Sequence, residues 1–203
     1  MLEEKNINTL CESERLLLKA LNNVKRRYLS HSYNRQRTFN IQRIESIFSH
    51  ELYHQLRLLQ NEENILRDLR IDFDLPKHHY EIKNTNCLNG LENKLFKPDL
   101  SIHKGQNSLS KQLLIGEIKM EGVDIASLLL DFQKLIYYKV SQLNFENAVF
   151  IYTGKKSDLE RKLSVFLSVE MLQCLTKNKV VIALQKEDNK KSFWNIYNFM
   201  NNL

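Results

Sequence analysis

Two stretches of the chain, residues 97–102 and 114–120, limit what it can fold into more than any other part of the sequence. Each has the length and the apolar content of a short β-strand. The residues between them include a polar run at 106–108, which favours a turn. The two stretches are therefore predicted to pair as an antiparallel hairpin within a sheet.

This hairpin would bring charged side chains of both strands together. Side chains alternate between the two faces of a strand, so Glu117 and Lys119, two residues apart, point the same way. Asp99 points away from Leu100 and Ile102, which have the character of core residues. One carboxylate from each strand can then share a divalent cation, with an ammonium group beside it, and such a site can hydrolyse a phosphodiester.

The same residues resemble a known catalytic motif. Pro98-Asp99 followed by Glu117-Ile118-Lys119 is similar to the PD-(D/E)XK motif of the restriction-endonuclease-like nuclease superfamily. The resemblance implies an enzyme that binds Mg²⁺, with Mn²⁺ as a substitute, through Asp99, Glu117 and the carbonyl group of Ile118. It also implies that Asp99, Glu117 and Lys119 are catalytic, and that the substrate is nucleic acid, DNA in preference to RNA.

A helix expected over residues 40–61 carries a carboxylate in an unusual position. On an ideal helical wheel Glu45 lies about 40° from the middle of the apolar stripe, and Glu51 lies at its edge, about 80° off. A carboxylate on an apolar face needs a cation or hydrogen-bond donors as partners. In the resembled superfamily the helix before the sheet often adds an acidic metal ligand, which makes Glu45 the first candidate and Glu51 the second. Pairing of Glu45 with an arginine at the rim of the core is the structural alternative.

The same helix contains a competing motif for a different function. Residues His50 to His54 match HExxH, in which two histidines one turn apart bind zinc and Glu51 would activate water in a metalloprotease. Both histidines point away from the apolar stripe on the wheel. No third ligand follows in a recognisable helical context, although Glu81 lies at a permissible distance. We therefore rank a zinc metalloprotease below the nuclease and expect surface histidines here.

A later helix, expected from 125 to about 142, carries Gln133 and Tyr137 on the flank of its apolar face. Gln-x-x-x-Tyr at this place resembles the motif that follows E-x-K in the RecB-like branch of the superfamily, where it helps to position the nucleic acid. The resemblance therefore implies that Gln133 and Tyr137 bind substrate. The flank of an ordinary amphipathic helix explains the same two residues without a function.

The order of the elements predicts the fold class. Further strands are expected at 78–83, 147–153 and 179–184, a helix over 158–172, and a closing strand or short helix at 193–197. The resulting αβββαβ order is that of the restriction-endonuclease-like core, so we expect a mixed α+β fold with a central mixed sheet flanked by helices. Residues 40–203 are assigned to this nuclease-like domain, and residues 1–39 to an N-terminal helical extension.

The composition and charge of the chain indicate which binding partners and which cellular compartment to expect. The chain has 203 residues, a net charge of +6 and a pI of about 9.1, which favours an anionic partner such as nucleic acid. It contains no apolar run of membrane-spanning length and no signal-peptide pattern at its start, so we expect a cytoplasmic protein without membrane contact. Three scattered cysteines, an odd number, indicate reduced thiols. The sequence does not decide between a monomer and a homodimer.

Together these patterns predict a magnesium-dependent nuclease that acts on DNA. Asp99 and Glu117 would hold the metal with help from Glu45. Lys119 would orient the attacking water, lower its pKa or stabilise the charge of the transition state, three roles that the sequence does not separate. Two alternatives remain, namely the zinc metalloprotease and a nucleic-acid-binding module on the same fold that does not cleave its ligand.

Overall fold

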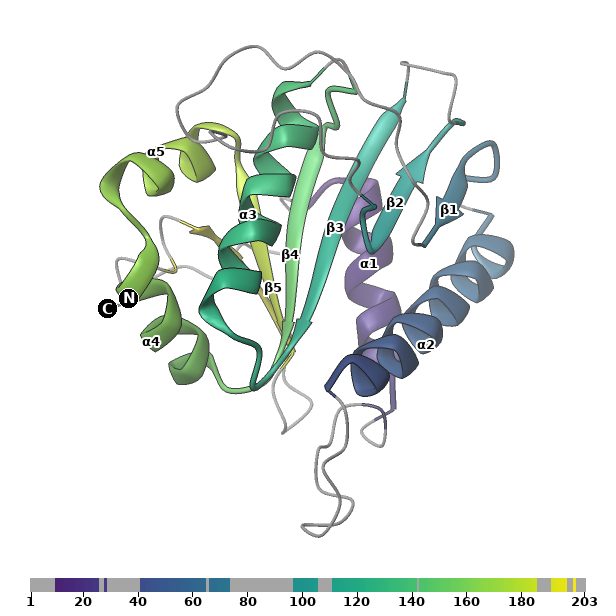
Figure 1. The fold of residues 1–203 in the computed structure, drawn as a ribbon. Coiled ribbons are helices and arrows are strands. Elements are labelled where there is room, and N and C mark those ends of the chain that lie inside the picture. Colours follow the sequence, from purple (N-terminus) through teal and green to yellow (C-terminus); the bar gives the residue numbers. More distant parts are fainter. Residues whose placement is uncertain are drawn as a thin grey trace, which may run out of the picture.

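A mixed sheet forms the centre of the molecule, and its described strands lie side by side in the order of the chain (Figure 1). The computed structural model describes residues 10–25, 28, 41–64, 66–73, 97–105, 111–141, 143–185, 191–196 and 199. β1, β2 and β3 are antiparallel neighbours, β3, β4 and β5 run parallel, and β6 is antiparallel to β5. The strands are β1 (Arg70–Asp72), β2 (Leu100–His103), β3 (Gln112–Met120), β4 (Asn147–Thr153), β5 (Val180–Gln185) and β6 (Lys191–Asn195).

Helices cover both faces of this sheet. α3, α4 and α5 lie over one face, and α1 lies behind the sheet (Figure 1). The parallel pairs need crossover connections, which α3 supplies between β3 and β4, and α4 with α5 between β4 and β5. The mixed α/β class predicted from the sequence is confirmed. In the described part of the chain the helices are α1 (Glu12–Asn23), α2 (Ile41–Glu62), α3 (Ile125–Val140), α4 (Lys156–Phe166) and α5 (Val169–Lys177).

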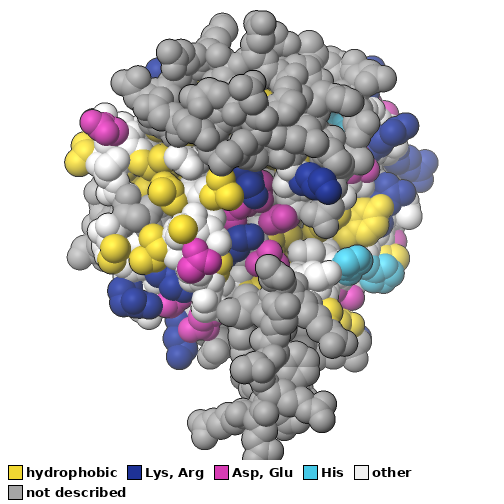
Figure 2. Space-filling view, in the orientation of Figure 1, with side chains coloured by type: hydrophobic (Ala, Val, Ile, Leu, Met, Phe, Trp, Pro, Cys, Tyr) yellow, Lys and Arg dark blue, Asp and Glu magenta, His cyan; other side chains and the backbone are white. Residues whose placement is uncertain are grey.

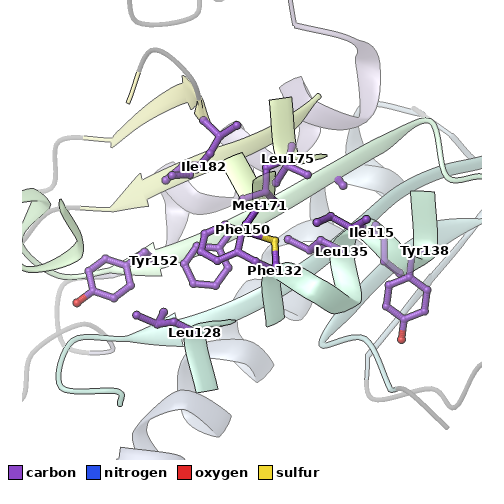
Figure 3. Packing of buried hydrophobic residues seen from close by; sticks show 14 of the residues in the cluster. Ile115, Leu128, Phe132, Leu135, Tyr138, Phe150, Tyr152, Met171, Leu175 and Ile182 are labelled. Carbon is purple, nitrogen blue, oxygen red and sulfur yellow. The ribbon is translucent and has the colours of Figure 1, made fainter. Parts of the chain in front are cut away.

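Side chains alternate between the two faces of each strand, so the sheet has a buried hydrophobic cluster on each face. On the α3 face Phe132 and Phe150 stack with 4.5 Å between ring centroids, in a cluster that α5 also joins (Figure 3). On the other face Leu100 and Ile118 of the sheet pack in one cluster with α1 and α2. α1, which we expected in the N-terminal extension, therefore shares its core with the sheet. Its contribution includes Leu16, Leu17, Ala20 and Leu21, and that of α2 includes Phe48, Leu52 and Leu56.

One predicted helix differs in the structure, and one strand of the sheet was not predicted. The described strand that pairs with β2 on the side away from β3 is β1, whose central residue Ile71 is buried between an exposed Arg70 and a half-buried Asp72. The strand predicted at 78–83 lies outside the described residues. The single helix predicted over 158–172 is two helices, because the Ser168 side chain accepts a hydrogen bond from the backbone of Met171 and begins α5 anew.

The cysteine prediction also needs correction. Cys11 has a free thiol, whereas Cys174 on α5 is in a disulfide bond, so the expectation of reduced thiols is wrong for Cys174. None of the described helices combines the length and the apolar character that crossing a bilayer requires.

Candidate functional site

β2 and β3 pair so that charged residues of both strands face the same side of the sheet. Leu100 lies opposite Gly116, and one step further in this antiparallel register Asp99, which precedes β2, comes beside Glu117. Leu100 belongs to the cluster under α1 and α2, so Asp99 and Glu117 face α3. Lys119, two residues after Glu117, points to the same face.

The carboxylate of Asp99 is held by the backbone of β3. Its Oδ2 accepts a hydrogen bond of 2.7 Å from the N–H of Ile118. Pro98 is buried, and its ring fixes the backbone just before Asp99. Burial raises the pKa of Asp99, although Lys119 and the Ile118 hydrogen bond act in the opposite direction. The sequence Pro-Asp therefore delivers a rigidly placed acidic group at the start of β2.

Glu117 is a fully buried carboxylate with only part of its hydrogen-bonding capacity used. Its Oε2 lies 3.3 Å from Nζ of Lys134, while its Oε1 is buried and has no hydrogen-bond partner within the described residues. Burial raises the pKa of Glu117 well above its usual value, and the nearby carboxylates of Asp99 and Asp131 raise it further. An unsatisfied buried carboxylate oxygen is costly, and a bound cation is one way to satisfy it.

Lys119 joins three elements of the fold. Its Nζ lies 3.2 Å from Oε1 of Glu45 on α2, 3.1 Å from Oδ2 of Asp131 on α3 and 3.1 Å from the carbonyl oxygen of Ile118. Burial alone would lower the pKa of Lys119, but the surrounding carboxylates, Asp131 before the others, raise it above its usual value. Lys119 is therefore protonated across the whole neutral range.

Glu45 enters the site from the amino-terminal end of α2. Its side chain is 22% exposed, and its pKa is raised because it is partly buried and lies near other carboxylates. Within the described residues its ion-pair partner is Lys119 of β3 and not the arginine that the structural alternative required. Glu51, the second candidate, instead accepts a hydrogen bond of 2.9 Å from Gln55 on its own helix.

α3 contributes two charged residues that the sequence reasoning did not identify. Asp131 is 3% exposed, and its Oδ1 lies 2.8 Å from Nζ of Lys134, one turn further along the helix. The same ammonium group contacts Glu117, so α3 is tied to the centre of β3. The sequence of α3 gives no sign of this, because Asp131 and Lys134 have the spacing of an ordinary surface ion pair. Glu45, Asp99, Glu117 and Asp131 are called the acidic cluster below.

Gln133 and Tyr137 lie elsewhere on α3. On an ideal helix Gln133 is roughly 160° around the axis from Asp131, so the two residues face different directions. Gln133 is half-buried, and Tyr137 is buried in the core cluster with its ring 5.5 Å from that of Tyr138. A role for Gln133 and Tyr137 in binding substrate stays a prediction.

The HExxH histidines lie on the surface of α2. His50 and His54 are both exposed, and Nδ1 of His50 is 2.6 Å from the backbone carbonyl oxygen of Ser46. Within the described ranges no three His, Cys, Asp or Glu side chains lie where they could hold a metal ion together. The zinc motif therefore has no third ligand in this part of the chain.

The acidic cluster does not meet this test either in the arrangement that the described residues adopt. Three of its carboxylates form ion pairs with Lys119 or Lys134, and Asp99 lies close enough to both lysines to interact with their charge. Four carboxylates exceed two ammonium groups in charge, and the unpartnered Oε1 of Glu117 leaves an oxygen for a ligand. The donors are all oxygens, the ligand type that Mg²⁺ prefers, but in this structure the two lysines occupy the space between them.

The site opens on one face of the molecule. Acidic and basic side chains lie next to each other in the middle of that face, flanked by hydrophobic side chains (Figure 2). A scan against models of protein families, a search of curated proteins and a search of solved structures each find no match for this chain.

Proposed function

We propose that this chain is a divalent-metal-dependent nuclease of the restriction-endonuclease-like fold, and that its substrate is DNA. The proposal depends above all on one observation, which is that Asp99 and Glu117 lie side by side in a buried site with Lys119 next to them. Structural ion pairs seldom leave a buried carboxylate oxygen without a partner, as Oε1 of Glu117 is. A site of this kind is suited to bind a cation and a phosphate group together.

The arrangement of the elements supports the same proposal. α2, β1, β2, β3, α3 and β4 follow one another in the αβββαβ order expected for this fold. In this order Asp99 precedes the second strand, Glu117 and Lys119 lie on the third, and Glu45 lies on the preceding helix, which supports the proposal. The positive net charge of +6 suits a polyanionic substrate.

The metal would be held by oxygen atoms of the chain. Asp99, Glu117 and the carbonyl group of Ile118 would bind Mg²⁺, and Glu45 would add a fourth ligand, directly or through water. When bound, the cation supplies positive charge that acidifies a water molecule and offsets the charge that develops on the phosphate. The hydrogen bond from the Ile118 N–H to Asp99 keeps that carboxylate in place before any metal arrives.

Lys119 would act as a cation and hydrogen-bond donor. Its raised pKa keeps it protonated at neutral pH, so it does not take a proton from the attacking water. Its Nζ is held by Glu45 and Asp131, which direct it into the site. From there it would orient the water through a hydrogen bond and stabilise the negative charge on the pentacovalent phosphate.

The test is cleavage of end-labelled single- and double-stranded DNA and RNA with Mg²⁺, Mn²⁺ or EDTA. The wild type should cut DNA only with metal, and Lys119→Ala should cut at least roughly 100-fold more slowly, as for loss of one transition-state donor. Lys139→Ala is the matched control, because Lys139 bonds the carbonyl oxygen of Glu146, outside the acidic cluster. Binding without metal-dependent cutting in all three proteins would contradict the proposal and favour a binding module.

A further inference from the structure

A cavity of about 510 Å³ adjoins the acidic cluster, and the chemistry proposed above leaves most of it unused. It lies between α2 and the chain segments that end β1 and begin β2. Glu45 and Asp99 line it, so it is continuous with the proposed metal site. Its volume is within the usual range for cavities that bind small organic molecules, about 300–1,000 Å³.

Aromatic rings form part of the cavity wall. Tyr53 of α2 and Phe73, directly after β1, both line it, with 5.3 Å between ring centroids and an angle of 70° between ring planes. Tyr53 is 36% exposed although its ring is large and mostly apolar. An exposed ring beside a cavity offers a flat surface on which a planar ligand can stack.

The described part of the wall carries mostly negative charge, which disfavours a phosphate group, and its other polar side chains besides Tyr53 are Ser46, Ser49 and His50. Among the described lining residues the charged side chains are the carboxylates of Glu45, Asp72 and Asp99, with no lysine or arginine. Asp72 is held in place by Nε2 of the buried His103, 2.7 Å from its Oδ2. Carboxylates beside aromatic rings suit a neutral, planar ring that donates N–H hydrogen bonds, which is the description of a nucleobase.

We propose that this cavity binds the base of the nucleotide next to the phosphate that is cut. This inference rests on the proposed nuclease function, and it names the substrate class as a strand with an unpaired nucleotide at the cut. A base in a duplex can enter such a cavity only after unstacking and unpairing, at a cost of a few kcal/mol. Single-stranded DNA and unpaired ends avoid that cost.

The test uses single-stranded oligonucleotides with one abasic residue placed at each position in turn, together with the intact strand and its duplex. In the wild type with Mg²⁺, an abasic residue next to the cut should slow cleavage there roughly tenfold, as for loss of one stacked base. Tyr53→Ala should slow cleavage of the intact strand by a similar factor. This variant should cut the intact strand and the abasic strand at the same rate. Tyr53→Phe keeps the ring and should therefore retain the dependence of cleavage on the abasic residue that Tyr53→Ala loses.

Two controls separate folding from binding. The thermal midpoint of Tyr53→Ala shows whether the variant is folded. Leu58→Ala removes another exposed side chain of the same helix, outside the described cavity lining, and should cut as the wild type does. Affinity for intact and abasic strands, measured by fluorescence anisotropy in EDTA, gives a readout that does not need cleavage.

The outcomes distinguish this inference from the proposed function. The cavity proposal would be overturned if neither the abasic residue nor Tyr53→Ala changed the rate of cleavage, or if the duplex were cut faster than the single strand. Either result would leave the nuclease proposal unaffected. Base-dependent binding that Tyr53→Ala abolishes, without any cleavage, would support the cavity and overturn the nuclease.

Discussion

Lys119 on β3 and Glu45 on α2 form an ion pair of 3.2 Å although they are 74 residues apart in the chain. The pair joins the amino-terminal end of α2 to the site on the α3 face of the sheet. Lys119 also reaches Asp131 of α3, so one ammonium group links the two helices that border the site. The lysines thus act as internal counterions for the acidic cluster.

Replacement of Glu117 by Gln should stabilise the metal-free protein at high pH. The folded state raises the pKa of Glu117, chiefly through burial, so its stabilising effect is present at low pH and is lost as the pH rises. In EDTA at pH 8, Glu117→Gln should raise the thermal midpoint by roughly 2–4 °C, the shift that about 1 kcal/mol produces at this chain length. The gain should vanish as the pH falls to the ordinary pKa of glutamate. A gain that grows toward low pH would contradict this account.

Divalent metal should stabilise the wild type but not a variant that lacks the first carboxylate. A ligand that binds only the folded state adds about 2.7 kcal/mol at 100 times its Kd. Mg²⁺ or Mn²⁺ should therefore raise the thermal midpoint of the wild type by several degrees, and Asp99→Asn should lose this increase. Glu51→Gln is the matched control on α2, because Glu51 accepts a hydrogen bond from Gln55. This variant should show the same metal effect as the wild type. An equal metal effect in Asp99→Asn would exclude Asp99 as a ligand.

Removal of Lys134 should strengthen metal binding. Its ammonium group lies 3.3 Å from Glu117 and 2.8 Å from Asp131, so it competes with a cation for the same carboxylates. In calorimetric titrations Lys134→Gln should bind Mn²⁺ roughly tenfold more tightly than the wild type. Lys139→Gln, on the same helix but bonded to Glu146, should bind as the wild type. Weaker Mn²⁺ binding in Lys134→Gln would show that Lys134 helps to build the site.

The zinc alternative makes an opposite prediction about metal content. If the protein is a nuclease, metal analysis of the purified chain should find no stoichiometric zinc, and His54→Ala should keep metal-dependent cleavage. His54 is exposed on α2, so the substitution should leave the fold unchanged. Stoichiometric zinc that His54→Ala removes would favour the metalloprotease over the nuclease.

The sequence was sufficient to predict local features that follow from a repeating pattern of side chains. Strand alternation around Asp99, Glu117 and Lys119 was enough to expect all three on one face, and the register of β2 and β3 brings them there. The apolar stripe of α2 likewise singled out Glu45, because a carboxylate on such a face needs a partner. These inferences use spacing within one element or one hairpin.

Features that depend on other elements were missed. β1 has only three residues, and Arg70 and Asp72 give it the composition of a polar connector, so only its pairing with β2 identifies it. Asp131 and Lys134 look like an ordinary surface pair three residues apart, because nothing in α3 itself indicates that Glu117 and Lys119 lie opposite. The break between α4 and α5 depends on the Ser168 cap inside an uninterrupted helical pattern.

The central claim is that Asp99 and Glu117 bind one divalent cation next to Lys119. Anomalous scattering from crystals soaked in Mn²⁺ tests it most directly. The account predicts a single strong peak in contact with one carboxylate oxygen of Asp99 and one of Glu117, with the ammonium group of Lys134 displaced from Glu117 and that of Lys119 beside the metal. A peak at His50 and His54, or an acidic cluster that keeps its lysines and binds no manganese, would contradict it.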